Sequence, residues 1–173
     1  MKKLVEYIIP FSGLKEGEHI FNIKVDKSFL KKFECEDIIN IKLDISVKMI
    51  KSNRLLEFNF FLSGKAMVEC DRCLEEFELP VNYHSRLFVK LEDIEEVEDE
   101  IIYIKPDESE IDISRFIYEN IVFSIPPRRV HPDDKKGKSM CNPEMLKKLE
   151  DHLIKDSEKS TDPRWNKLKD LLN

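Results

Sequence analysis

Apolar and polar residues alternate along the first half of the chain. Residues 39–49 have apolar side chains at odd positions and polar ones at even positions. After Ser52 and Asn53, apolar side chains take the even positions of residues 56–68. A period of two places one face of a strand in a core. These segments therefore predict a long antiparallel hairpin, in which the break in the pattern at Gly64 indicates a bulge.

Further strands are predicted on both sides of this hairpin. Apolar residues at odd positions of residues 77–91 indicate a third long strand, and its Pro80 must lie at an edge or a bend because it lacks a backbone N–H. Residues 4–9 and 19–25 are shorter strand candidates, and Asp26 is a suitable cap for a short helix that follows.

The period changes in the last third of the chain. Asp112 can cap a helix that ends before Pro126 and Pro127, with an apolar stripe of Ile113, Phe116, Ile117, Ile121 and Val122. A second helix is expected to begin after Asn142, with Pro143 at its first position. A third helix is expected to begin in the same way, with Asp162 as its cap and Pro163 at its first position, after a polar linker at residues 156–162.

Together these elements predict an α+β fold: a curved antiparallel sheet or partial barrel with one packed helix and a C-terminal helical tail. The length of 173 residues is typical of one domain. Residues 1–127 are expected to form it and to carry the turn at residues 70–73. Residues 128–173, a basic loop and the C-terminal helices, are interpreted as an extension of the same domain.

Composition and motifs narrow the class of function. No apolar run approaches the length of about 18 residues that a membrane span needs, and no export signal is recognisable, so a cytoplasmic protein is expected. The four glycines form no phosphate-binding motif, and the four histidines lie apart from any nucleophile motif. We therefore expect a protein that is not an enzyme.

The net charge of −6 conceals two segments of opposite charge. Residues 92–112 contain eleven acidic residues and one basic residue, Lys105, which gives −10. Residues 126–148 contain seven basic and three acidic residues, which gives +4. Solvated surface segments explain this equally well, but clustered cations are also what binds phosphate. The candidate RNA-binding residues are Arg72, Arg128, Arg129, Lys135, Lys136 and Lys138.

Cys70 and Cys73 form a CxxC pair with three interpretations. The two cysteines can simply pack in a turn, hold a metal ion, or form a redox dithiol; the last is disfavoured because a helix N-terminus is absent there. A structural Zn²⁺ needs two more ligands, for which His131 and Cys141 are the candidates. Cys35 is interpreted as a small buried residue near the end of its helix.

Several motifs resemble a known family. They are the CxRCL segment (Cys70, Arg72, Cys73, Leu74), the helix that ends in Ile125-Pro126-Pro127, and the DPRW of residues 162–165 with Leu168. In this order, from about Leu14 onward, the chain resembles the YceD-like family, the large ribosomal RNA subunit accumulation proteins. The resemblance implies a bacterial cytoplasmic protein without enzymatic activity that supports 23S rRNA accumulation and large-subunit assembly. Many members complete a four-cysteine zinc site with a CxxCG element. In the corresponding region this chain has only His131 and Cys141 as possible ligands.

The leading hypothesis is a factor that binds rRNA or a large-subunit precursor. One alternative is a protein-binding adaptor, whose acidic residues 92–100 would hold a basic ribosomal protein. Another is a zinc-stabilised interaction module. Phe77, Tyr83 and Trp165 could stack on bases, although at strand and helix spacing such residues more often belong to a core.

Overall fold

The computed structural model describes residues 5–93 and 101–153. A 3₁₀ turn at Val5–Tyr7 precedes the strands β1 (Ile8–Pro10) and β2 (Gly17–Asp26) and the short helix α1 (Lys27–Lys31). Three long strands follow, β3 (Asn40–Lys51), β4 (Leu55–Glu69) and β5 (Glu76–Leu91). The remaining elements are β6 (Ile101–Ile104), β7 (Glu110–Asp112), α2 (Ser114–Ser124) and α3 (Pro143–His152).

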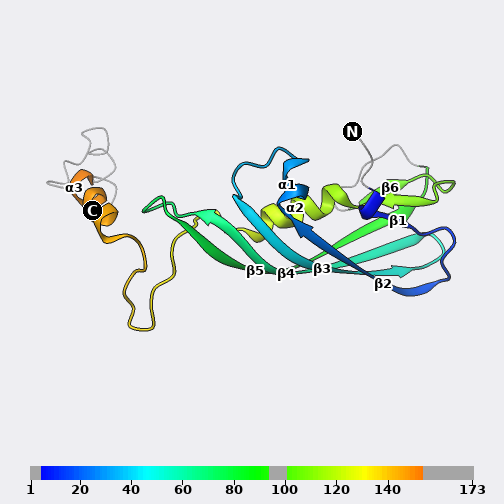
Figure 1. The fold of residues 1–173 in the computed structure, drawn as a ribbon. Coiled ribbons are helices and arrows are strands. Elements are labelled where there is room, and N and C mark those ends of the chain that lie inside the picture. Colours follow the sequence, from blue (N-terminus) through cyan, green and yellow to red (C-terminus); the bar gives the residue numbers. More distant parts are fainter. Residues whose placement is uncertain (1–4, 94–100, 154–173) are drawn as a thin grey trace, which may run out of the picture.

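Five strands form an open, curved sheet in the order β2-β3-β4-β5-β6 (Figure 1). The first four pair antiparallel as a meander, whereas β6 runs parallel to β5 and pairs only with its last residues, Phe88–Leu91. A separate two-stranded sheet joins β1 to β7. The predicted α+β fold is therefore confirmed, and of the two predicted forms, a curved antiparallel sheet or a partial barrel, the structure shows a mostly antiparallel sheet that is not closed.

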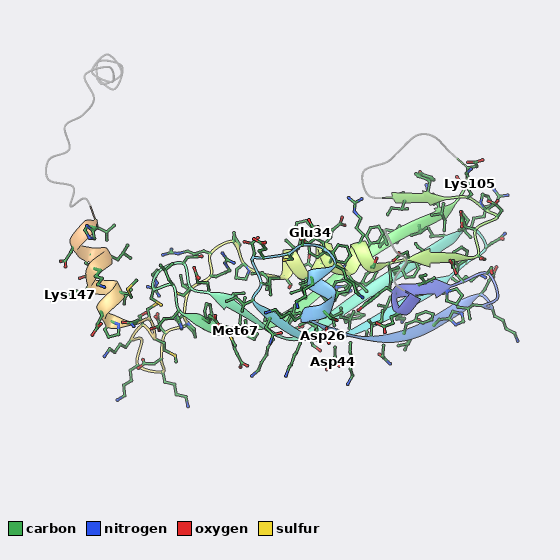
Figure 2. All side chains as sticks on the ribbon, turned by 45° about the horizontal axis from the view of Figure 1, so that its top comes forward. Asp26, Glu34, Asp44, Met67, Lys105 and Lys147 are labelled. Carbon is green, nitrogen blue, oxygen red and sulfur yellow. The ribbon has the colours of Figure 1, made fainter. Side chains whose placement is uncertain are left out.

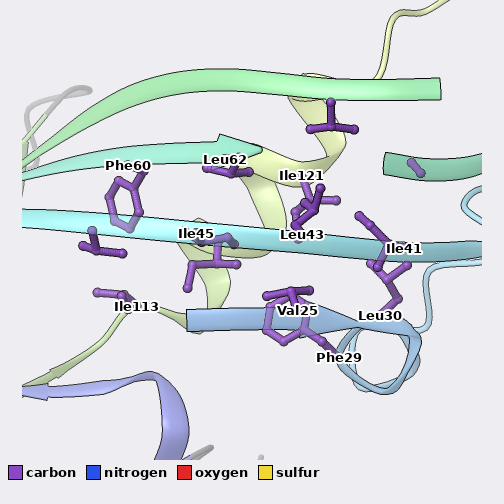
Figure 3. Packing of buried hydrophobic residues seen from close by; sticks show 14 of the residues in the cluster. Val25, Phe29, Leu30, Ile41, Leu43, Ile45, Phe60, Leu62, Ile113 and Ile121 are labelled. Atoms are coloured by element: carbon purple, nitrogen blue, oxygen red, sulfur yellow. The ribbon is translucent and has the colours of Figure 1, made fainter. Parts of the chain in front are cut away.

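One face of the sheet carries the core, and α1 and α2 lie on this face (Figure 1). Odd residues of β3 except Lys51 and even residues of β4 except Gly64 are buried, as their alternation predicts. Figure 3 shows Ile41 and Ile45 of β3 and Ile121 of α2 within this cluster. None of the described helices lies on the opposite face of β2–β5, from which Asp44 of β3 projects (Figure 2).

Local signals in the sequence correctly located several element ends. The Asp26 carboxylate accepts a hydrogen bond from the Ser28 N–H at 2.8 Å, which begins α1. The Asn142 side chain accepts hydrogen bonds from the Glu144 and Met145 N–H groups at the start of α3. Pro80 lies where β5 has only β4 as a described neighbour, so no ladder hydrogen bond is lost there.

Other expectations are wrong. The register of β4 runs through Gly64 without interruption on both sides, so there is no bulge. Val122 does not belong to the buried stripe of α2, because 42% of it is exposed. Cys35 is half-buried and follows the end of α1. The described part of the acidic residues 92–112 contains the strands β6 and β7, which were not predicted from the sequence.

Some expectations concern residues outside those that the structure describes. These are most of the acidic residues 92–100, the polar linker at residues 156–162 and the third helix around Trp165. Within the described ranges, α3 buries none of its residues and lies beyond the end of the sheet (Figure 1). None of the described helices has the length and apolar character that crossing a membrane requires.

Candidate functional site

The turn between β4 and β5 positions the CxxC pair. The Cys70 N–H donates to the Glu75 carbonyl at 3.0 Å, and the Leu74 N–H donates to the Cys70 carbonyl at 2.9 Å. Leu74 adopts a φ of +61°, which is unfavourable for a residue with a bulky side chain. This tight geometry turns both thiols inward, and Cys70 and Cys73 are 0% and 2% exposed.

The loop after α2 brings two more ligand groups to this turn. The Sγ atoms of Cys70 and Cys141 are 3.7 Å apart, and the Cys73 Sγ lies 3.4 Å from the His131 Nδ1. All four ligand atoms lie within 4.8 Å of one another. The structure thus brings together the four residues that the sequence indicated as metal ligands, and we call them the Cys₃His cluster.

Two of the distances in the Cys₃His cluster match the edges of a tetrahedral metal site. With metal–sulfur and metal–nitrogen distances of about 2.3 and 2.0 Å, a tetrahedron has edges of about 3.8 Å between sulfurs and about 3.5 Å between sulfur and nitrogen. The distances of 3.7 and 3.4 Å match these edges. Three thiols and one imidazole are also a donor set typical of structural zinc.

The two cysteines of the turn differ in acidity. Burial acts to raise the pKa of the Cys70 thiol, but hydrogen bonds from the backbone of Arg72, Cys73 and His131 and from the His131 side chain together outweigh it and lower this pKa to about 6. Burial raises the pKa of the Cys73 thiol. Backbone donors around Cys70 therefore favour a thiolate, the form that binds metal.

Hydrogen bonds beside the Cys₃His cluster also fasten the loop to the turn. The Asp71 N–H donates to the Arg129 carbonyl at 2.7 Å, and the Arg129 N–H donates to the Asp71 carboxylate at 2.5 Å. The Arg129 guanidinium reaches the Asp37 carbonyl at 3.0 Å, and Asn142 donates to the Glu75 carboxylate at 2.6 Å. Contacts from several points of the turn thus fix the path of the loop.

Three lysines of the loop lie in an exposed hairpin, which we call the basic hairpin (residues 133–139). A bridge between Asp133 and Ser139 closes it, and the Asp134 carboxylate accepts hydrogen bonds from the Lys136 and Lys138 N–H groups, both at 2.8 Å. Gly137 supplies the positive φ of +76° that the turn needs. As a result, Lys135, Lys136 and Lys138 project into solvent.

The six predicted RNA-binding residues fall into two groups. Arg128 and the three lysines of the basic hairpin are exposed. Arg129 is held by Asp71 and Asp37, while the Arg72 Nη2 donates to the Ser139 Oγ at 3.2 Å. Arg72 and Arg129 therefore help to hold the loop in place.

Sequence reasoning missed Asp71, Glu75 and Ser139 as the residues that position the loop. Their only signal is proximity to the cysteines, because their partners lie far away in the sequence. Two of the aromatic residues considered for base stacking belong to the core: Phe77 is buried against the His131 ring at 4.6 Å between centroids, and Tyr83, in the middle of β5, is partly buried.

Comparisons with known proteins give one match. The model of the family described as large ribosomal RNA subunit accumulation protein YceD matches residues 58–172, a range that includes the whole Cys₃His cluster and the basic hairpin. No curated protein and no solved structure is similar enough to match the chain.

Proposed function

Since the chain belongs to the YceD family of large ribosomal RNA subunit accumulation proteins, we propose that it supports 23S rRNA accumulation by binding this RNA or a large-subunit precursor. The family name itself implies a role in the accumulation of large-subunit RNA. On this proposal the protein acts in the cytoplasm, where subunits assemble, and catalyses no reaction.

The observation that carries the proposal is the fixed presentation of the basic hairpin. Lys135, Lys136 and Lys138 are exposed, and the loop that bears them is fastened at both ends to the turn between β4 and β5. Clustered cations bind RNA by releasing counterions from its phosphates. A fixed hairpin loses little conformational freedom on binding, so more of this gain remains as affinity. Phosphate contacts of this kind set position rather than read sequence.

We further propose that the Cys₃His cluster holds one structural Zn²⁺. Cys70, Cys73, His131 and Cys141 would occupy all four positions of a tetrahedral ion, so the ion supplies a cross-link and leaves no open position for catalysis. This cross-link joins residues that are 71 and 58 positions apart in the chain. Its role is to stabilise the loop in the conformation that presents the basic hairpin.

A charge reversal tests the RNA-binding step. Replacing Lys135, Lys136 and Lys138 by glutamate should release the tagged protein from large-subunit precursors in a sucrose gradient at low salt. The matched control reverses Lys27, Lys31 and Lys32, three exposed lysines on and beside α1. We expect the control to remain with the particles, since it makes the same change in net charge elsewhere.

Two other outcomes would change the proposal. If depletion of the protein leaves ribosomal subunit profiles unchanged, the assembly role is wrong. If depletion lowers large-subunit levels but neither charge reversal releases the protein, the protein-binding adaptor with its acidic residues 92–100 becomes the better explanation.

A further inference from the structure

An aromatic pair lies on the face of the sheet opposite α2. Phe61 of β4 and His84 of β5 are directly paired across the two strands, and their rings stack with centroids 4.5 Å apart at an angle of 24°. Phe61 is 47% exposed. Such exposure of a large ring in the middle of a four-stranded surface leaves apolar area that no described element covers.

A row of four paired residues runs across the strands through this pair. Besides the two rings, it contains only uncharged polar side chains. Asn22 of β2 pairs with Ser46 of β3, Ser46 pairs with Phe61, and Phe61 pairs with His84. We call these four residues the Phe61 platform. It therefore runs across four strands and offers an amide, a hydroxyl and two stacked rings.

A shallow hollow of about 280 Å³ adjoins the platform, lined by Asn22, Lys24, Asp44, Ser46, Phe61 and Ser63. It lies on the β2–β3 side of Phe61, whereas His84 stacks from the β5 side. The ring of Phe61 thus has one face on His84 and its other side toward a hollow with amide, hydroxyl and carboxylate groups. These groups can donate and accept hydrogen bonds at the edge of a planar ring placed there.

Charges around the platform favour an anionic partner. The rows on either side of it, across the same four strands, contain the cations Lys24, Lys48 and Arg86, the single anion Asp44, and otherwise uncharged residues. Counting Glu18, the ion-pair partner of Lys48, leaves a local excess of one positive charge, against a net charge of −6 for the chain. Lys24 lies 3.8 Å from Asp44 and Lys48 lies 2.7 Å from Glu18, but Arg86 has no ion-pair partner among the described residues.

From this geometry we infer that the Phe61 platform binds an unpaired base of single-stranded RNA. The base stacks on Phe61, its edge meets Asn22 and Ser46, and Arg86 contacts a neighbouring phosphate. Aromatic side chains on an open sheet are a common way to bind unstacked bases, because every base has a π face. This inference rests on the proposed function and adds a second RNA-contacting surface. The Phe61 platform prefers single strands, whereas the basic hairpin contacts the phosphates of single and double strands alike.

The test measures binding of a fluorescein-labelled, unstructured RNA of about 12 nucleotides, and of the same sequence as a duplex, by anisotropy. Phe61→Leu keeps an apolar side chain but removes the π face, and should weaken single-strand binding by about 5- to 100-fold. Phe61→Tyr should retain it. Ile20→Ala is the matched control, because Ile20 is 64% exposed on the same face and should not matter. Duplex binding should stay unchanged in all three variants.

Failure of the inference is distinguishable from failure of the proposed function. Suppose that the Phe61→Leu protein binds single strands as the wild type does, while replacing Lys135, Lys136 and Lys138 by glutamate abolishes binding. RNA binding by the Phe61 platform is then refuted, and RNA binding by the basic hairpin is supported. If Phe61→Leu weakens single-strand binding and the glutamates do not, the inference stands and the role of the hairpin is wrong. A Phe61→Leu protein that sediments as a monomer where the wild type is a dimer would identify this face as a self-contact and overturn the inference.

Discussion

At Gly64, strand β4 lies so close to β3 that a residue with a side chain does not fit. A Cβ at this position would clash with the Lys42 carbonyl oxygen and meet the Leu43 Cα at 3.0 Å. The φ of +149° is also one that residues with side chains rarely adopt. Glycine therefore lets β4 stay in register with β3 at this close approach.

Gly64→Ala should destabilise the protein by at least about 2 kcal/mol, because it combines backbone strain with a clash against a carbonyl group. Urea unfolding followed by circular dichroism measures this difference. Gly13→Ala is the control: a Cβ there meets nothing within 4 Å, so its midpoint should remain near that of the wild type. Equal midpoints for the two variants would show that the strands can move apart at little cost.

The burial and roles of single residues were predictable from the sequence in some cases and not in others. Alternation correctly gave the buried face of β3 and β4, since burial on a strand follows directly from its period of two. The break in that pattern at Gly64 was misread, because a missing side chain looks the same for a bulge and for a close approach. The four residues of the Cys₃His cluster could be named from ligand chemistry, but their distances depend on the path of a loop that no local pattern determines.

At the scale of elements, the Cys₃His cluster joins the turn after β4 to the loop after α2. Cys141→Ser removes one ligand and should reduce bound zinc well below one ion per chain, measured by elemental analysis of protein purified without chelator. The loop should then loosen, and amide exchange at Asp71, whose N–H donates to the Arg129 carbonyl, should become faster.

Cys35→Ser provides the matched control for this experiment, because Cys35 is the one cysteine outside the Cys₃His cluster. Its zinc content and the protection of Asp71 should equal those of the wild type. A wild-type protein without zinc, or a Cys141→Ser protein that keeps a full ion, would contradict the structural zinc site.

Long elements and capped helices were predictable, whereas short strands were not. The long strands carry several repeats of their pattern, and α3 begins with a recognisable cap and proline. All four residues of β6 are partly exposed and apolar or aromatic, so they show no alternation. Its parallel pairing with β5 and the pairing of β7 with β1 depend on distant partners, which local periodicity does not reveal.

For the whole molecule, the net charge of −6 opposes association with a polyanion such as RNA. Binding then requires that cations are gathered locally, within the distance of about 8–10 Å over which charges act at physiological salt. The basic hairpin meets this condition, because three exposed lysines lie within four consecutive residues around Gly137. Local presentation rather than total charge should therefore determine the affinity for RNA.

The salt dependence of RNA binding tests this distinction. Replacing Lys135, Lys136 and Lys138 by glutamine should make the plot of log affinity against log salt concentration less steep by about 2, since each lost phosphate contact with a single strand contributes about 0.7. Replacing Lys27, Lys31 and Lys32 by glutamine changes the net charge by the same three units, but should leave the slope unchanged. If both triple variants change the slope equally, the RNA responds to total charge, and the fixed hairpin is not its binding site.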